Sequence, residues 1–186
     1  MTPILQKLLD RAVTEAQITF DKEGIVVPFI VGYTGDDKIR HWTLPDKTTE
    51  NKNAMALYFK IMLHYTKSTA YVLVSEAWAL RIENISDEER KQIAKEAMEH
   101  GISNHPLRYE AIHYVIDDGK ECYAGEQGII RPAGGKAIFD EIKIDKLPKP
   151  FEGRFTNLLK MNDKEMGLFK EIEDYYNRIS NIAFPN

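Results

Sequence analysis

The chain has 186 residues, of which 43% are hydrophobic and 29% are charged, and its formal net charge is −4. These values are close to the averages of folded globular proteins and argue against intrinsic disorder. The length suits one domain spanning residues 1–186. The negative charge provides no overall field that would attract nucleic acid or an anionic membrane, so we expect neither as a partner.

Cys122 is the only cysteine, which excludes an internal disulfide and a multi-cysteine zinc site. No apolar run approaches the ~20 residues needed to cross a bilayer. The first residues have the pattern of an amphipathic helix rather than of a signal peptide. These features predict a soluble protein of the cytoplasm.

Thr2 and Pro3 predict the start of a helix, because threonine is a good N-cap and proline suits the first helical position. Apolar residues then recur at helical spacing as far as Gly24. The apolar segment 25–31 and the segment 38–44 flank turn-forming residues and predict a β-hairpin. Pro28 cannot donate a backbone hydrogen bond, so it belongs at an edge of the sheet or at a bulge, and we expect that the first of these strands is not central.

The segment 54–65 is apolar over most of its circumference, which predicts a deeply packed helix. Residues 71–82 predict a core strand. Ser86 and Glu89 form the pattern of a capping box, which predicts a charged, exposed helix ending near Gly101.

The segments 107–116 and 121–131 flank a strong turn sequence and predict a second hairpin. A further strand is predicted over 136–144 and a last helix over 163–182. Together these elements predict the α+β class, with a mixed but mostly antiparallel sheet of about six strands and helices packed on one face. The order of the strands is left open.

Glu76 is the most unusual residue of the predicted core strand. Alternate residues of a strand share a face, so Glu76 shares the face of Val74 and Trp78, which should be dry. An ionised carboxylate is costly there unless a cation or hydrogen-bond donors meet it. Glu76 therefore indicates a site.

A similar pattern occurs in the strand predicted over 107–116, where Arg108 and Glu110 share the face of Ile112. If this strand pairs with the strand of Glu76, Arg108 could bind the Glu76 carboxylate, with Glu110 or His105 at the same opening. The candidate catalytic residues are therefore Glu76, His105, Arg108 and Glu110. The alternative is a purely structural ion pair or a polar sheet face turned to water.

No other pattern indicates chemistry. The five histidines lack the spacing of metal ligands, so no metal site is predicted, and no motif identifies a cofactor. Ser75 lies within a strand and lacks the glycine-flanked turn of a nucleophile elbow, so a serine hydrolase is not predicted.

The absence of a catalytic motif favours a non-enzymatic binding or interaction module. Its partner would be an unidentified protein or small molecule bound through the sheet face, or a second copy of the chain. The alternative is a hydrolase-like or transferase-like enzyme. In that enzyme Glu76 and Glu110 would serve as acid and base, and Arg108 would stabilise developing anionic charge.

Overall fold

The computed structural model describes residues 1–44, 51–80, 85–133, 135–148 and 155–183, with the backbone alone for Asn104 and residues 175–183. Its elements, in chain order, are α1 (Pro3–Glu23), β1 (Phe29–Tyr33), β2 (Ile39–Thr43), α2 (Lys52–Tyr65), β3 (Ala70–Leu80), α3 (Asp87–His100), η1 (Ile102–Asn104), β4 (Arg108–Asp117), β5 (Cys122–Ile130), β6 (Ile138–Phe139), β7 (Lys143–Lys146) and α4 (Asp163–Ala183).

All described strands pair antiparallel in one sheet of order β2-β1-β3-β4-β5-β6, and β7 pairs with an earlier part of the same edge of β5. The α+β class and the antiparallel sheet are therefore confirmed. The single strand expected over 136–144 is instead the two short strands β6 and β7.

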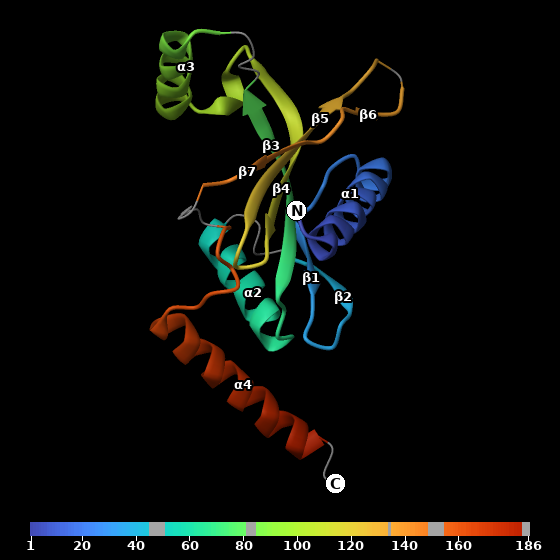
Figure 1. Ribbon diagram of the computed structural model, residues 1–186, viewed down its shortest axis with the longest axis vertical. Coiled ribbons are helices and arrows are strands. Elements are labelled where there is room, and N and C mark those ends of the chain that lie inside the picture. The colour runs from blue at the N-terminus through green and yellow to red at the C-terminus, as the bar shows by residue number, and fades with distance from the viewer. Residues whose placement is uncertain (45–50, 81–84, 134, 149–154, 184–186) are drawn as a thin grey trace.

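The helices α1 and α2 lie on opposite faces of the sheet, as Figure 1 shows. Val72 and Val74 of β3 pack in the cluster that contains α1, and Tyr71 and Leu73 pack in the cluster that contains α2. The expectation that the helices share one face therefore needs correction. The start of β3 is apolar without alternation, and a strand that is apolar on both sides needs cover on both sides.

Strand β1 is an inner strand, since it pairs with β2 on one side and β3 on the other. Of the two positions expected for Pro28, the edge of the sheet is therefore wrong. Pro28 precedes Phe29, the first residue of the strand, so its missing N–H removes no ladder hydrogen bond. Among the described residues, β2 is the edge strand on this side of the sheet.

The predicted hairpin of β1 and β2 is confirmed, and Gly32 is a point of close approach within it. A Cβ atom at Gly32 would lie 2.7 Å from the Trp42 ring and 3.1 Å from a methyl of Leu63 in α2. Trp42 therefore packs over β1 on the α2 face. Only glycine leaves room for the ring at this position.

The predicted neighbours β3 and β4 do pair, and β4 and β5 form the second predicted hairpin. The carboxylate of Asp118 holds the turn by accepting hydrogen bonds from the N–H groups of Lys120 and Glu121 at 2.9 and 2.7 Å. This is the local bonding that makes aspartate frequent in turns.

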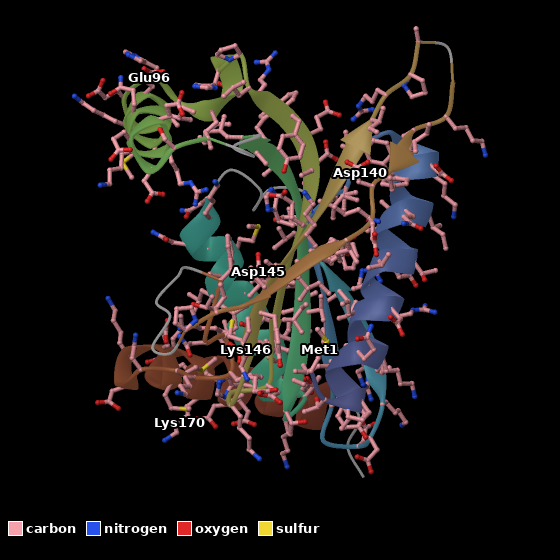
Figure 2. The ribbon with its side chains drawn as sticks, turned by 45° about the horizontal axis from the view of Figure 1, so that its top comes forward. Met1, Glu96, Asp140, Asp145, Lys146 and Lys170 are labelled. Carbon is pink, nitrogen blue, oxygen red and sulfur yellow. The ribbon has the colours of Figure 1, made fainter. Side chains whose placement is uncertain are left out.

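The predicted capping box of Ser86 and Glu89 opens α3, and none of its residues is buried. Figures 1 and 2 show α3 at one end of the sheet, apart from α1 and α2. The last helix, α4, extends away from the sheet beyond α2. It is held near its start by an ion pair of Glu165 with Lys60 at 2.7 Å and by a ring contact of Phe169 with His64.

The described residues 155–162, which precede α4, are attached to the sheet at Asp117, whose side chain is buried. Asp117 accepts hydrogen bonds from the Tyr71 hydroxyl at 3.3 Å and the Asn157 N–H at 3.1 Å. Leu158 is fully buried in the α2-side cluster. A buried carboxylate with several donors is well satisfied, and here it holds the chain that leads into α4 against the sheet.

Candidate functional site

The carboxylate of Glu76 meets a backbone donor and a cation. The Val26 N–H donates to it at 2.7 Å, and the guanidinium of Arg131 lies 3.8 Å away. The side chain is 20% exposed, so the carboxylate lies at the rim of the core. The prediction that this face must supply a partner for Glu76 fits the structure, but the cation is not Arg108.

Arg131 joins three parts of the chain. It forms an ion pair with Glu110, donates to the Gly24 carbonyl at 3.1 Å, and stacks on the ring of Phe20 at 4.6 Å. The β4–β5 register explains its place, because Glu110 lies opposite Ile129 and Arg131 follows the end of β5. The cluster of Glu76, Glu110 and Arg131 therefore ties the α1–β1 connection to the sheet.

Arg108 and His105 lie elsewhere. The β3–β4 register places Arg108 opposite Leu80, and its guanidinium stacks on the Trp78 ring at 4.7 Å. His105 accepts the Leu107 N–H at 3.2 Å and lies 3.8 Å from Glu96 of α3. The structure thus brings Glu76 and Glu110 to one cation but gives Arg108 and His105 other partners. Their catalytic roles stay a prediction.

A second polar row crosses the opposite face of the sheet. Ser75, His113 and Glu126 occupy directly opposed positions in β3, β4 and β5. Burial lowers the pKa of His113, and the nearby Glu126 opposes that shift. His113 Nδ1 lies 3.9 Å from Glu126, too far for a hydrogen bond, and Glu126 instead accepts the hydroxyl of Tyr109. The row is therefore not arranged to activate Ser75.

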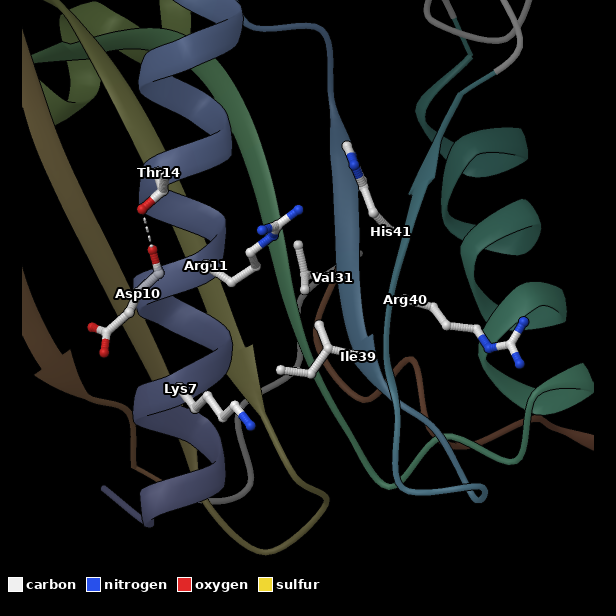
Figure 3. Close-up of a pocket in the computed structure, with 8 residues that line it drawn as sticks. All are labelled: Lys7, Asp10, Arg11, Thr14, Val31, Ile39, Arg40 and His41. Carbon is white, nitrogen blue, oxygen red and sulfur yellow. Dashed lines mark hydrogen bonds between the residues drawn. The ribbon is translucent and has the colours of Figure 1, made fainter.

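A groove of about 620 Å³ lies between α1 and the β1–β2 hairpin. Figure 3 shows the residues that line it, which are Lys7, Asp10, Arg11, Thr14, Val31, Ile39, Arg40 and His41. Lys7 and Arg11, one turn apart on α1, extend toward the β1–β2 hairpin, whereas Asp10 and Arg40 point away from the space between the helix and the hairpin. The groove thus has an apolar floor of Val31 and Ile39 and a basic wall.

The charges of the groove are only partly balanced. Arg11 forms an ion pair with Glu15, but no described residue forms an ion pair with Lys7. Partial burial lowers the pKa of His41, Glu15 opposes this shift and Arg11 reinforces it. The ring of His41 packs edge-on against Phe29 at 4.6 Å. The imidazole of His41 therefore lines the groove mainly in its neutral form near pH 7.

The backbone of β2 has an open side next to this groove. The Thr34 N–H donates to the Lys38 carbonyl at 2.9 Å, and hydrogen-bonded pairs alternate along an antiparallel ladder. Arg40 and Trp42 consequently bond to β1, while the N–H and C=O groups of Ile39, His41 and Thr43 point outward. No strand in the described part of the chain pairs with that side.

A second hollow, of about 370 Å³, flanks the other face of the same edge. Its lining includes Arg40, Tyr65 and Lys67. Hydrogen bonds from Thr34, Lys38 and Arg40 hold the pKa of Asp36, in the hairpin loop, well below its usual range. Tyr65 is 63% exposed, which is unusual for so large a ring. The edge of β2 therefore lies between two hollows.

These residues were not recognised in the sequence. Lys7 and Arg11 lie on the polar face of a helix, and His41 lies in a short strand, so each has the pattern of a solvent-exposed surface. The one available clue is that β2 alternates without an apolar face, which is typical of an edge strand. Arg131 was missed because 55 positions separate it from Glu76.

Metal ligands do not gather anywhere in the described ranges, where no group of three or more His, Cys, Asp or Glu side chains could hold an ion. Within the same ranges, no helix has the length and apolar character needed to cross a membrane.

No protein-family model matches the chain, and no curated protein and no solved structure is significantly similar to it.

Proposed function

We propose that the protein is an interaction module that binds an extended segment of another protein as an added strand along β2. The observation that carries this proposal is the outer edge of β2, whose backbone groups at Ile39, His41 and Thr43 have no strand partner in the described chain. Strand addition at an exposed sheet edge is a common mode of peptide recognition.

The two hollows support the same proposal. Side chains of an added strand point alternately to the two faces of the sheet. On one face they would enter the groove between α1 and the hairpin, and on the other they would reach the hollow beside Tyr65. Backbone hydrogen bonds would provide affinity, and these hollows would select side chains.

The size of the edge sets the expected strength. Strand β2 has five residues, so an added strand would bury a small area and make a few backbone hydrogen bonds. Such interfaces are typical of transient complexes. We expect dissociation constants of about 1–100 μM, as for other weak contacts.

The alternative enzyme, with Glu76 and Glu110 as acid and base and Arg108 as the cation, has less support. Glu76 and Glu110 already bind Arg131, and Arg108 stacks on Trp78. None of these residues lines either hollow described above. The interaction module is therefore the better-supported function.

Backbone amide exchange measured by NMR tests the module directly. The probes are three short peptides with valine at every second position, separated by glutamate, glutamine or lysine. Binding of at least one of them should slow exchange at the Ile39, His41 and Thr43 amides. The amides of Arg40 and Trp42 provide an internal control, because they already bond to β1. If none of the three peptides protects the outer amides, the proposal is wrong.

A pair of variants separates backbone pairing from side-chain contact. His41→Pro removes one outward N–H and leaves the bonds to β1 intact, and proline is tolerated on an edge strand in this orientation. The matched control, His41→Ala, removes the same imidazole but keeps the N–H. We expect His41→Pro to abolish peptide binding and His41→Ala to keep most of it. Equal binding by the two variants would contradict strand addition.

A further inference from the structure

The edge of β2 is locally basic in a protein that is acidic overall. The α1 groove is lined by Lys7, Arg11, Arg40 and Asp10, and the hollow beside Tyr65 shares Arg40 and adds Lys67 and Asp36, so four cations and two carboxylates line the two hollows together. The whole chain carries a net charge of −4. The residues that line the two hollows thus carry a local excess of positive charge along the edge that we propose as the binding surface.

The carboxylates near the groove are committed to other partners. Asp10 accepts a hydrogen bond from Gln6 at 2.9 Å and points away from β2 in Figure 3. Glu15 forms the ion pair with Arg11. The ammonium group of Lys7, one turn before Arg11, has no ion-pair partner among the described residues. A charge that faces a groove without a partner is available to an incoming ligand.

We propose that the segment received by β2 is acidic, with carboxylate side chains at alternate positions directed toward Lys7 and Arg11. This inference rests on the function proposed above. The hydrocarbon part of each acidic side chain would lie over Ile39 and its carboxylate would reach the basic wall. The intervening side chains would point to the opposite hollow, where the exposed ring of Tyr65 offers an apolar contact.

A second copy of the chain fits this edge less well. If β2 paired with β2 of another copy, Lys7 and Arg11 of both copies would lie at the same interface. Like charges brought together in this way are unfavourable, and they are a common means of preventing edge-to-edge association. The charge distribution therefore favours an acidic partner over self-association.

The inference predicts a dependence of affinity on charge and on salt. The glutamate peptide should bind about tenfold more tightly than the glutamine peptide at low ionic strength, and the lysine peptide should bind more weakly than both. Raising the salt concentration should reduce the difference, because the Debye length falls to about 8 Å at physiological ionic strength.

Titration of the full chain with the three peptides, followed by the exchange of the outer β2 amides, tests the inference. Lys7→Glu should weaken binding of the glutamate peptide by about tenfold and improve binding of the lysine peptide. The matched control is Lys91→Glu on the exposed helix α3, which makes the same change of net charge far from the groove and should leave both affinities unchanged.

The outcomes separate the two proposals. If the three peptides protect the outer amides with equal affinity, strand addition stands and the acidic partner is overturned. Equal effects of Lys7→Glu and Lys91→Glu would also overturn it, because only the net charge would then matter. If no peptide protects the outer amides, both proposals fail.

Discussion

The side chain of Glu76 accepts a hydrogen bond from the backbone N–H of Val26 at 2.7 Å, across 50 positions of the sequence. Val26 lies between α1 and β1, and no strand in the described part of the chain pairs with it. The carboxylate therefore acts in place of a neighbouring strand. Together with Arg131 it fixes the path of the chain from the helix into the sheet.

Replacing Glu76 with alanine tests this structural role. Glu76→Ala removes the acceptor of the Val26 N–H and one partner of Arg131, so we expect the free energy of unfolding to fall by about 2 kcal/mol. Urea denaturation followed by circular dichroism measures the change. The control is Glu99→Ala on α3, where the side chain is 53% exposed and the expected change is below about 0.5 kcal/mol. Equal losses in the two variants would argue against a special role for Glu76.

Gly32→Ala should destabilise the hairpin of β1 and β2. The added methyl would lie 2.7 Å from the rigid Trp42 ring, and such overpacking costs about 1–3 kcal/mol. Thermal or urea unfolding provides the measurement. The cost should be smaller in a Trp42→Leu background, where the ring is absent. A cost that is the same in both backgrounds would show that the ring is not the cause.

The stability of the protein should fall on mild acidification. Burial lowers the pKa of His113 below its ordinary value of 6.5, so the unfolded chain binds a proton more readily than the folded chain. The contribution of neutral His113 is thus complete above about pH 6.5 and is lost as the pH falls through the folded pKa. Burial also lowers the pKa of His64, which acts in the same direction.

Unfolding free energies measured between pH 5 and 8 check this dependence. His113→Gln should flatten the pH profile, since one of the buried imidazoles is gone. His100→Gln provides the control, because His100 is 78% exposed on α3. If His113→Gln leaves the profile unchanged, burial of His113 is not coupled to folding.

The ion pair of Lys60 and Glu165 should control the docking of α4. Lys60→Met keeps the long side chain but removes the charge, so the first turns of α4 should lose their attachment to α2. Hydrogen exchange measured by mass spectrometry should become faster in α4 while the sheet is unaffected. Lys164→Met, at an exposed neighbouring position, is the matched control. Unchanged exchange in α4 would exclude the ion pair as its main attachment.

Local sequence patterns predicted the elements of the fold well. The capping box at Ser86, the turn at Asp118 and the helical spacing of α1 each depend on residues a few positions apart, so they can be read directly. The position of β1 could not be read in this way. Pro28 indicated an edge strand or a bulge, but proline constrains only its own N–H, and the ladder begins one residue later.

The candidate site was predicted only in part. The alternation of β3 singled out Glu76 as a carboxylate that needs a partner. The alternation of β4 placed Glu110 on the face of Ile112, which the β3–β4 register makes the face of Glu76. The partner itself depends on how β5 is aligned with β4, which brings Arg131 rather than Arg108 to the cluster. That alignment, like the groove beside β2, depends on contacts between distant segments that a single sequence does not display.

The anchoring of Asn157 and Leu158 has a consequence for how the chain can be divided. The Asn157 N–H bonds to the buried Asp117, Leu158 is fully buried beside Tyr71, and Glu165 pairs with Lys60. These contacts are noncovalent, and they join the C-terminal segment to the sheet and to α2. They do not require that the peptide chain before this segment is continuous. We therefore expect two fragments, cut between residues 149 and 154, to reassemble when mixed, so that the protein could serve as a split pair.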